Sequence, residues 1–169
     1  MRPAYFDTSV FLALFKPEKN ARIIRDLLKE LKEAKIRIYT SILSVQEVSV
    51  LTFRRGAPAR DNFARIARIA RIVNMNKEIA LSAAKLEASI ADDAKENEIQ
   101  RVLKQRRKWD CFHIATAQFY NCSDIYAADA GLLSRGPQLE IKNMDFSKPE
   151  PRKLSLFGRT TGGDLTLTP

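Results

Sequence analysis

Short runs rich in β-branched and aromatic residues alternate along this chain with longer segments of helical periodicity, and this alternation constrains the fold more than any other feature. We expect strands at 3–7, 36–40, 124–129 and 139–144, and a brief strand at 72–75. We expect helices at 8–15, 17–34, 41–55, 59–72, 77–108 (with a break near 92–98) and 110–120. Such alternation is typical of an α/β domain with a mainly parallel central sheet flanked by helices.

The length favours one domain, because 169 residues can bury a sizeable core but are short for two domains. From residue 147 onward, proline, glycine and threonine accumulate and helical periodicity ends. We therefore expect a domain over residues 1–147 and a C-terminal tail over 148–169. Within the tail, residues 165–168 alternate like an edge strand that would pair with another chain.

Several classes of protein are disfavoured by the composition. The longest apolar run, at 10–15, is far too short to cross a bilayer, and the first residues lack the pattern of a signal peptide. The two cysteines form neither a disulfide framework nor a metal-binding pair, which favours a cytoplasmic protein. The single histidine, His113, excludes a site built from several histidines of one chain, and leaves it a structural or an acid–base role.

Positive charge is the other strong feature of the composition. The formal net charge is +9, and the excess gathers at 65–72 and 101–108. Basic proteins attract phosphate polymers, anionic membranes or acidic partner proteins, although two solvated helix faces would give the same pattern. The second cluster contains the cations that we expect to contact nucleic acid: Arg101, Lys104, Arg106, Arg107 and Lys108.

Two aspartates follow predicted strands. Asp7 ends the first strand and Asp129 ends the strand at 124–129, and sites in open parallel sheets form at the carboxyl ends of the strands. Each aspartate also precedes a helical segment, so helix capping is an alternative role for both. Asp124 is a weaker candidate, because it begins its strand.

Two further carboxylates lie on predicted helices. Glu47 belongs to an apolar stripe of the helix at 41–55 and should be partly buried, which a carboxylate tolerates only when it is paired or bound to a metal. Asp110 stands at the expected start of the helix at 110–120, where it would serve as the N-cap, and its face of that helix points inward.

We refer to Asp7, Glu47, Asp110 and Asp129 as the four acids. If they converge, each pair of carboxylates at about 5 Å repels by roughly 3 kcal/mol at an effective dielectric constant of 20. No lysine or arginine has an obvious bridging position within the four local segments, so a divalent cation is needed. Oxygen ligands from aspartate and glutamate suit Mg²⁺ or Mn²⁺, which favours metal-assisted hydrolysis of a phosphodiester.

The segments that carry the four acids together resemble the PIN-domain ribonucleases, above all the single-domain VapC-type toxins of toxin–antitoxin pairs. These segments are YFDTSVFLALF, TSILSVQEV, WDCFHIATA and DIYAADAGLL. The resemblance runs from about residue 3 to residue 145 and implies a three-layer PIN-like domain. It also implies that the four acids bind one or two Mg²⁺ or Mn²⁺ ions, that a water activated by the metal attacks the RNA phosphorus, and that Thr8 or Ser9 supports the site by hydrogen bonding.

The likeness to this family also implies partners. The basic residues at 101–108 would receive the RNA backbone. PIN domains of this type commonly form homodimers and VapC-type toxins hold an acidic antitoxin, so we expect a second copy and an acidic antitoxin as protein partners. The homodimer would form mainly through the helices at 17–34 and 41–55, whose apolar residues exceed one buried stripe.

This chain departs from the family in places, and other functions remain open. The family often has threonine or serine two residues before the fourth acid, where Ala127 stands here, so a supporting hydroxyl is missing beside Asp129. A housekeeping RNA-processing nuclease and a non-catalytic RNA-binding module with the same fold are alternatives to a toxin. A haloacid-dehalogenase-like phosphatase would have a second aspartate in place of Ser9.

Overall fold

A computed structural model describes residues 2–15, 19–56, 59–90 and 98–150, and at residues 19, 60 and 98–106 it describes the backbone. The elements alternate as predicted. In chain order they are β1 (Ala4–Phe6), α1 (Thr8–Phe15), α2 (Lys19–Glu33), β2 (Ile38–Ser41), α3 (Ile42–Arg54), α4 (Arg60–Ala67), β3 (Arg71–Val73), α5 (Lys77–Ala88), α6 (Glu98–Phe119), β4 (Asp124–Tyr126), α7 (Ala130–Gln138) and β5 (Asp145–Ser147).

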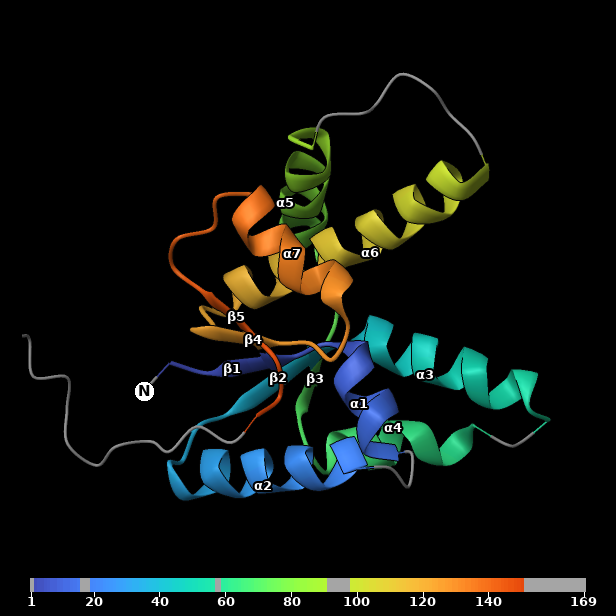
Figure 1. Cartoon of the computed structure of the whole chain (residues 1–169), viewed down its shortest axis with the longest axis vertical. Helices are drawn as coiled ribbons and strands as arrows, with labels where there is room; N and C mark the ends of the chain where they lie inside the picture. The colour runs from blue at the N-terminus through green and yellow to red at the C-terminus, as the bar shows by residue number, and fades with distance from the viewer. Residues whose placement is uncertain (1, 16–18, 57–58, 91–97, 151–169) are drawn as a thin grey trace, which may run out of the picture.

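The strands form one parallel sheet with the order β3-β2-β1-β4-β5. The chain runs from the central strand β1 outward to β3, and then returns to the other side of β1 for β4 and β5 (Figure 1). Parallel neighbours need a crossover, and the helices between the strands supply it. The prediction of an α/β fold with a mainly parallel sheet is confirmed.

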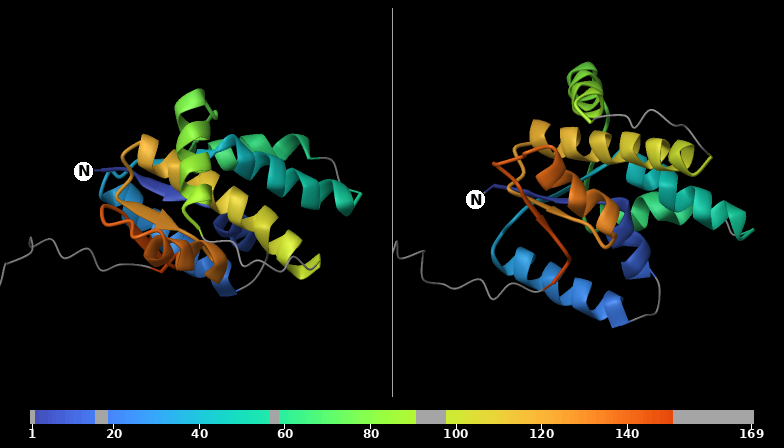
Figure 2. Two further views of the ribbon diagram at one scale, coloured as in Figure 1. Left: turned by 90° about the horizontal axis from the view of Figure 1, so that it is seen from above. Right: turned by 45° about the horizontal axis from the view of Figure 1, so that its top comes forward.

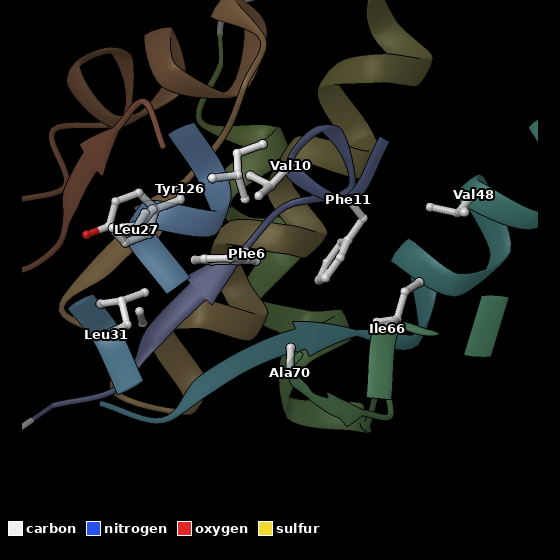
Figure 3. Close-up of a cluster of buried hydrophobic side chains, with 11 residues drawn as sticks. Phe6, Val10, Phe11, Leu27, Leu31, Val48, Ile66, Ala70 and Tyr126 are labelled. Atoms are coloured by element: carbon white, nitrogen blue, oxygen red, sulfur yellow. The ribbon is translucent and has the colours of Figure 1, made fainter. Parts of the chain in front are cut away.

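Helices cover both faces of the sheet and make three layers (Figures 1 and 2). Successive side chains of a strand point to opposite faces, so β1 feeds two cores. Phe6 belongs to the cluster with α1, α2, α3 and α4 that is drawn in Figure 3, whereas Tyr5 belongs to a cluster with α6 and α7. A third cluster joins α5 to α6 through Ile79, Cys111 and Ala115.

The helical region before β4 differs from the prediction. We expected a helix at 77–108 and another that begins at Asp110, but one helix, α6, runs without interruption from Glu98 to Phe119. The prediction that Asp110 caps a helix is therefore wrong. The sequence between these ends holds no proline or glycine, so nothing local ends the helix at residue 108, and Asp110 is carried on an interior turn.

The last predicted strand, at 139–144, is also wrong, because β5 lies at Asp145–Ser147. Helix α7 extends to Gln138, and Glu140 then adopts a left-handed backbone with φ of 51°. The backbone N–H of Ile141 donates to the carbonyl of Gly136 at 3.1 Å, which closes the helix end and turns the chain away from strand geometry. The expected edge strand at 165–168 lies outside the described residues.

The helices at 17–34 and 41–55 use their apolar residues differently. In α2, Ile24, Leu27 and Leu31 are buried in the domain's own core, so little of its stripe is left for a partner. In α3, Leu51 and Phe53 remain 37% and 65% exposed. Of the described helices, none is both long and apolar enough to cross a membrane.

Candidate active site

The four acids line one cleft of about 710 Å³ at the carboxyl end of the sheet. Asp7 follows β1 and Asp129 follows β4, and these two strands are neighbours at the place where the strand order reverses. Open α/β sheets bind ligands at such a place. Glu47 reaches the cleft from α3 and Asp110 from α6, so segments far apart in the sequence build one site.

Asp7 is 5% exposed and is held by Ser9. Its Oδ2 accepts hydrogen bonds from the backbone N–H of Ser9 at 3.0 Å and from Ser9 Oγ at 2.7 Å, so Asp7 also caps the start of α1. Ser9 Oγ accepts a hydrogen bond from the backbone N–H of Ala128 at 2.8 Å. Ser9 therefore connects the end of β1 to the segment after β4, and so fixes the position of Asp7 relative to that segment.

Glu47 points toward Asp7 rather than away from it. Thr8 Oγ1 donates a hydrogen bond to Glu47 Oε2, and His113 Nε2 lies 3.4 Å from the same oxygen. Burial by itself would raise the pKa of Glu47, but the contacts with His113 and Thr8 lower it below its ordinary value. The carboxylate is therefore ionised and held in place at neutral pH.

His113 is buried between two of the acids. Its Nε2 lies 3.4 Å from Asp7 Oδ1 and 3.4 Å from Glu47 Oε2, and its Nδ1 lies 2.7 Å from the hydroxyl of Tyr5. Burial would lower the pKa of His113, but the nearby carboxylates, first of all Asp7, raise it above its ordinary value. The imidazole Nε2 thus lies between the carboxylates of Asp7 and Glu47, while Nδ1 contacts the hydroxyl of Tyr5.

Asp110 forms an ion pair that the sequence did not predict. Arg135, on α7, places Nε 3.3 Å from Asp110 Oδ2. We expected no bridging arginine or lysine within the four local segments, and Arg135 lies two residues beyond the last of them, DIYAADAGLL. The packing of α7 therefore supplies a positive charge that those segments lack. Burial raises the pKa of Asp110 to about 6, against the lowering effect of Arg135 and with a further raising effect from Asp7 and Asp129.

Asp129 is exposed at the rim of the cleft and is the N-cap of α7. Its Oδ1 accepts hydrogen bonds from the backbone N–H groups of Gly131 at 2.9 Å and Leu132 at 3.3 Å. A Cβ added at Gly131 would lie 3.1 Å from Asp129 Oδ1 and 3.9 Å from Asp110 Oδ2, so Gly131 lies between these two carboxylates. The helix-capping role that was one alternative for Asp129 is therefore confirmed, and a single oxygen, Oδ1, accepts both hydrogen bonds.

A chain of buried hydroxyls supports the wall of the cleft. Thr40 Oγ1 donates to the carbonyl of Phe6 at 2.8 Å and lies 2.9 Å from Ser44 Oγ, which is 3.1 Å from Thr8 Oγ1. The chain joins the ends of β1 and β2 to α3. It therefore positions Thr8, the donor to Glu47, from two strands at once.

The predicted RNA-binding cations belong to α6 and precede, in the sequence, the residues of that helix that line the cleft. Arg101, Lys104 and Arg106 are in its N-terminal half, and their side chains lie outside the described residues. Of the remaining two, Arg107 is half-buried and Lys108 is exposed. Their contact with RNA therefore stays a prediction.

The donor atoms of the cleft fit a hard divalent cation. Carboxylate and hydroxyl oxygens are the ligands that Mg²⁺ and Mn²⁺ prefer. Among the described residues of the cleft, four carboxylates face one arginine, Arg135, and one histidine, His113, so acidic side chains outnumber basic ones. In the described part of the chain, no three acidic, histidine or cysteine side chains are already gathered as a metal ligand set. Binding an ion would therefore require these carboxylates to move closer together.

Sequence reasoning missed Arg135, Thr40 and Ser44, and placed Trp109 and Gln46 in no role. Thr40 and Ser44 lie inside the segment TSILSVQEV, so the clustered hydroxyls beside Glu47 were an available signal. Arg135 carries no such signal, because its distance from Asp110 depends on how α7 packs on α6. Trp109 directly precedes Asp110, and both Trp109 and Gln46 line the cleft.

Comparisons with known proteins agree with this architecture. The family model for the PIN domain matches residues 4–136, a range that includes all four acids. No curated protein sequence matches the chain. Among solved structures, VapC20 of Mycobacterium tuberculosis, described as a toxin that cleaves the sarcin–ricin loop, is similar with a TM-score of 0.54. It shares 20% sequence identity, and the match covers 79% of this chain and 95% of that one. At this identity the structural likeness supports the fold.

Proposed function

We propose, because this chain belongs to the PIN domain family, that it is a metal-dependent endoribonuclease that hydrolyses RNA phosphodiester bonds. The observation that carries the proposal is the convergence of Asp7, Glu47, Asp110 and Asp129 on one cleft at the carboxyl end of the sheet. A cleft that only bound RNA would gain nothing from carboxylates that repel phosphate. A cleft that holds Mg²⁺ or Mn²⁺ needs them.

Each residue has a distinct task in this proposal. When bound, the divalent cation lowers the pKa of water and neutralises charge on the phosphate oxygens. Asp7, Glu47 and Asp110 would hold it, with Asp129 at the rim. Ser9 and Thr8 keep Asp7 and Glu47 oriented through the hydrogen bonds described above. His113 limits the repulsion between those two carboxylates while the ion is absent.

A toxin of a toxin–antitoxin pair is the finer form of this proposal. VapC20 is described as a toxin, and this chain matches nearly all of that structure. A net charge of +9 suits both an RNA substrate and an acidic antitoxin. A cytoplasmic location belongs to the same proposal, because that is where such a toxin meets RNA.

Cleavage of a mixed RNA pool by the full chain tests the activity. We expect cleavage with Mg²⁺ or Mn²⁺ and none after chelation. Asp7→Asn should lose more than about 100-fold, because even the partners of metal ligands contribute about 10- to 100-fold. Asp26→Asn, an exposed carboxylate on α2, is the matched control and should cleave like the wild type. Equal cleavage by wild type and Asp7→Asn would contradict the proposal, and RNA binding without cleavage would favour the non-catalytic alternative.

A homodimer is proposed through α3 rather than α2, since the structure buries the stripe of α2. Phe53 on α3 and Phe63 on α4 are 65% and 51% exposed. Light scattering at micromolar concentration should give twice the monomer mass for the wild type and the monomer mass for Phe53→Ser. Leu81→Ser on α5, 62% exposed in the wild type, is the control and should leave the dimer intact. A wild-type monomer at every concentration would contradict the dimer and leave the proposed activity unaffected.

A further inference from the structure

We propose that Trp109 is a stacking platform for a nucleobase of single-stranded RNA, and so helps to determine which phosphodiester reaches the four acids. This inference rests on the proposed function and names a specificity-determining residue of the same site. Trp109 lines the cleft, remains 37% exposed, and directly precedes Asp110 on α6. An indole left open inside a cleft that must receive a polymer is a surface to which a base can bind.

The indole is held in place by its own helix. Its ring packs on Phe112, one turn further along α6, with 5.9 Å between ring centroids and 35° between ring planes. Phe112 is half-buried and packs against the core cluster between α5 and α6. A ring supported from behind loses little side-chain entropy on binding, which is what a stacking platform requires.

The lining of the cleft contains apolar side chains besides Trp109. Leu12 of α1 and Val50 and Leu51 of α3 line the same cleft, and Leu51 is 37% exposed. Metal ligation explains the carboxylates, and Leu12 packs against the core cluster that contains Phe6, but metal ligation gives no use to Val50 and Leu51. A nucleobase explains them, because its two faces are apolar while its phosphate carries the charge toward the ion.

Gln46 adds a group that can recognise the edge of a base. It is exposed on α3, beside Glu47 in sequence, and lines the cleft. Its carboxamide both donates and accepts hydrogen bonds, as the edges of all four bases require. The lining of the cleft therefore combines apolar side chains, a polar amide and carboxylates, which matches the base and phosphate of one nucleotide.

The sequence supplies its own reporter for this contact. Trp109 is the only tryptophan of the chain, so intrinsic fluorescence reads this residue alone. We would titrate short single-stranded RNA into the full-length Asp7→Asn variant with Mg²⁺, and into the wild type after chelation. Stacking should quench the fluorescence. An oligomer of the same length that carries abasic positions keeps the phosphates and should quench little.

Binding of labelled RNA to substituted proteins gives a second measurement. Trp109→Ala should weaken the affinity by about 5- to 100-fold, the loss expected for one stacked base, and Trp109→Phe should recover most of it. Phe119→Ala is the matched control, because Phe119 lies on the same helix, is 44% exposed, and is not among the residues that line the cleft. Thermal unfolding of each variant verifies that the fold is kept.

The outcomes separate this inference from the proposed activity. If the wild type cleaves RNA and Trp109→Ala binds RNA as tightly as the wild type, the stacking platform is overturned and the nuclease activity is retained. Quenching by normal but not by abasic RNA, in a protein that cleaves nothing, would support the platform and overturn the nuclease. Equal quenching by both oligomers, or no change of fluorescence with RNA, would overturn the platform. A protein partner would then be the ligand that covers the apolar side chains of the cleft.

Discussion

Arg135 is the residue whose role the structure changes most. It pairs with Asp110 at 3.3 Å, and its Nη1 donates a hydrogen bond to Gln138 Oε1 at 2.5 Å, which holds the guanidinium beside the cleft. An ion pair with only 18% and 17% of the two side chains exposed is more than a surface contact. The same positive charge that neutralises Asp110 also opposes a second cation at that carboxylate, so Arg135 and a divalent ion compete for it.

Removal of this competitor should strengthen metal binding. We expect Arg135→Gln to bind Mn²⁺ roughly tenfold more tightly than the wild type, because one positive charge within a few ångströms is lost. Calorimetric titration of the metal-free proteins measures the affinity without reference to catalysis. Arg68→Gln, an exposed arginine after α4, should behave like the wild type. Weaker binding by Arg135→Gln would mean that Arg135 orients Asp110 as a ligand instead.

The two cysteines should be chemically silent in the native protein. Burial raises the pKa of Cys111 to about 11 and that of Cys122 to about 12. Thiolate is the reactive form, so a thiol reagent at pH 8 should label neither cysteine before unfolding and both afterwards. Rapid labelling of the native chain would contradict this burial.

The same thiols predict a loss of stability in base. Their folded pKa values lie above the ordinary value of 9.0, so the stabilising contribution is complete below pH 9 and is lost as the pH rises toward 11 and 12. We expect the free energy of unfolding to fall by up to about 1.4 kcal/mol per pH unit for each thiol above pH 9. Urea unfolding at pH 8 and pH 10.5 measures it, and Cys122→Ala should reduce the slope.

At the scale of the elements, α7 depends on a close approach to β5. Gly136 is buried on α7, and a Cβ added there would lie 2.7 Å from Cε2 of the Phe146 ring. Only the absence of a side chain lets this helix pack so tightly on that strand. The contact matters for the site, because α7 also carries Arg135 and is capped by Asp129.

Gly136→Ala should therefore destabilise the fold despite the better helix propensity of alanine. We expect a loss of about 1–3 kcal/mol, the usual cost of overpacking a core, in thermal or urea unfolding. Ser134→Ala, an exposed position on the same helix, should change the stability by less than about 0.5 kcal/mol. A more stable Gly136→Ala protein would show that Phe146 has room to move.

At the scale of the whole molecule, the net charge of the protein and the charge of the acids in the cleft have opposite signs. The chain carries a net charge of +9, yet four carboxylates gather at one edge of the sheet. In the proposed function, long-range attraction of RNA therefore comes from other cations, and α6 carries a run of them in the sequence before Trp109 and Asp110. In this proposal the residues that attract RNA and an acid that binds the metal ion therefore lie on the same helix, at different positions.

This division predicts a strong dependence of RNA affinity on salt. If the cations at 101–108 contact phosphates, the logarithm of the affinity should fall by roughly 0.7 per contact for each tenfold rise in salt. Replacement of Arg101 and Lys104 by glutamine should lower that slope by roughly 1.4. Lys29→Gln, which lies on α2 across the sheet and is 79% exposed, should not change it. An affinity independent of salt would assign these cations to a protein partner.

Much of the fold was predictable, because strand and helix signals are local. The β-branched and aromatic residues of runs such as 36–40 and 124–129 predict strands, and helical periodicity can be recognised from neighbouring positions alone. The alternation then leaves few topologies other than a parallel sheet with helices on both faces. The failures fell where the end of an element depends on packing, at the uninterrupted α6 and at the left-handed turn after α7.

The sequence by itself determined which side chains are the candidates for chemistry here: four acids in order, their hydroxyl neighbours and a basic run. Only the tertiary structure decided how they are paired. His113 and Tyr5 are separated by 108 positions, and Arg135 and Asp110 by 25, so no local pattern specifies either contact. Such pairs form because two elements pack against a common sheet, and packing depends on every core residue at once. Residue types therefore predicted a kind of site, whereas the fold determined which basic side chains contact the acids.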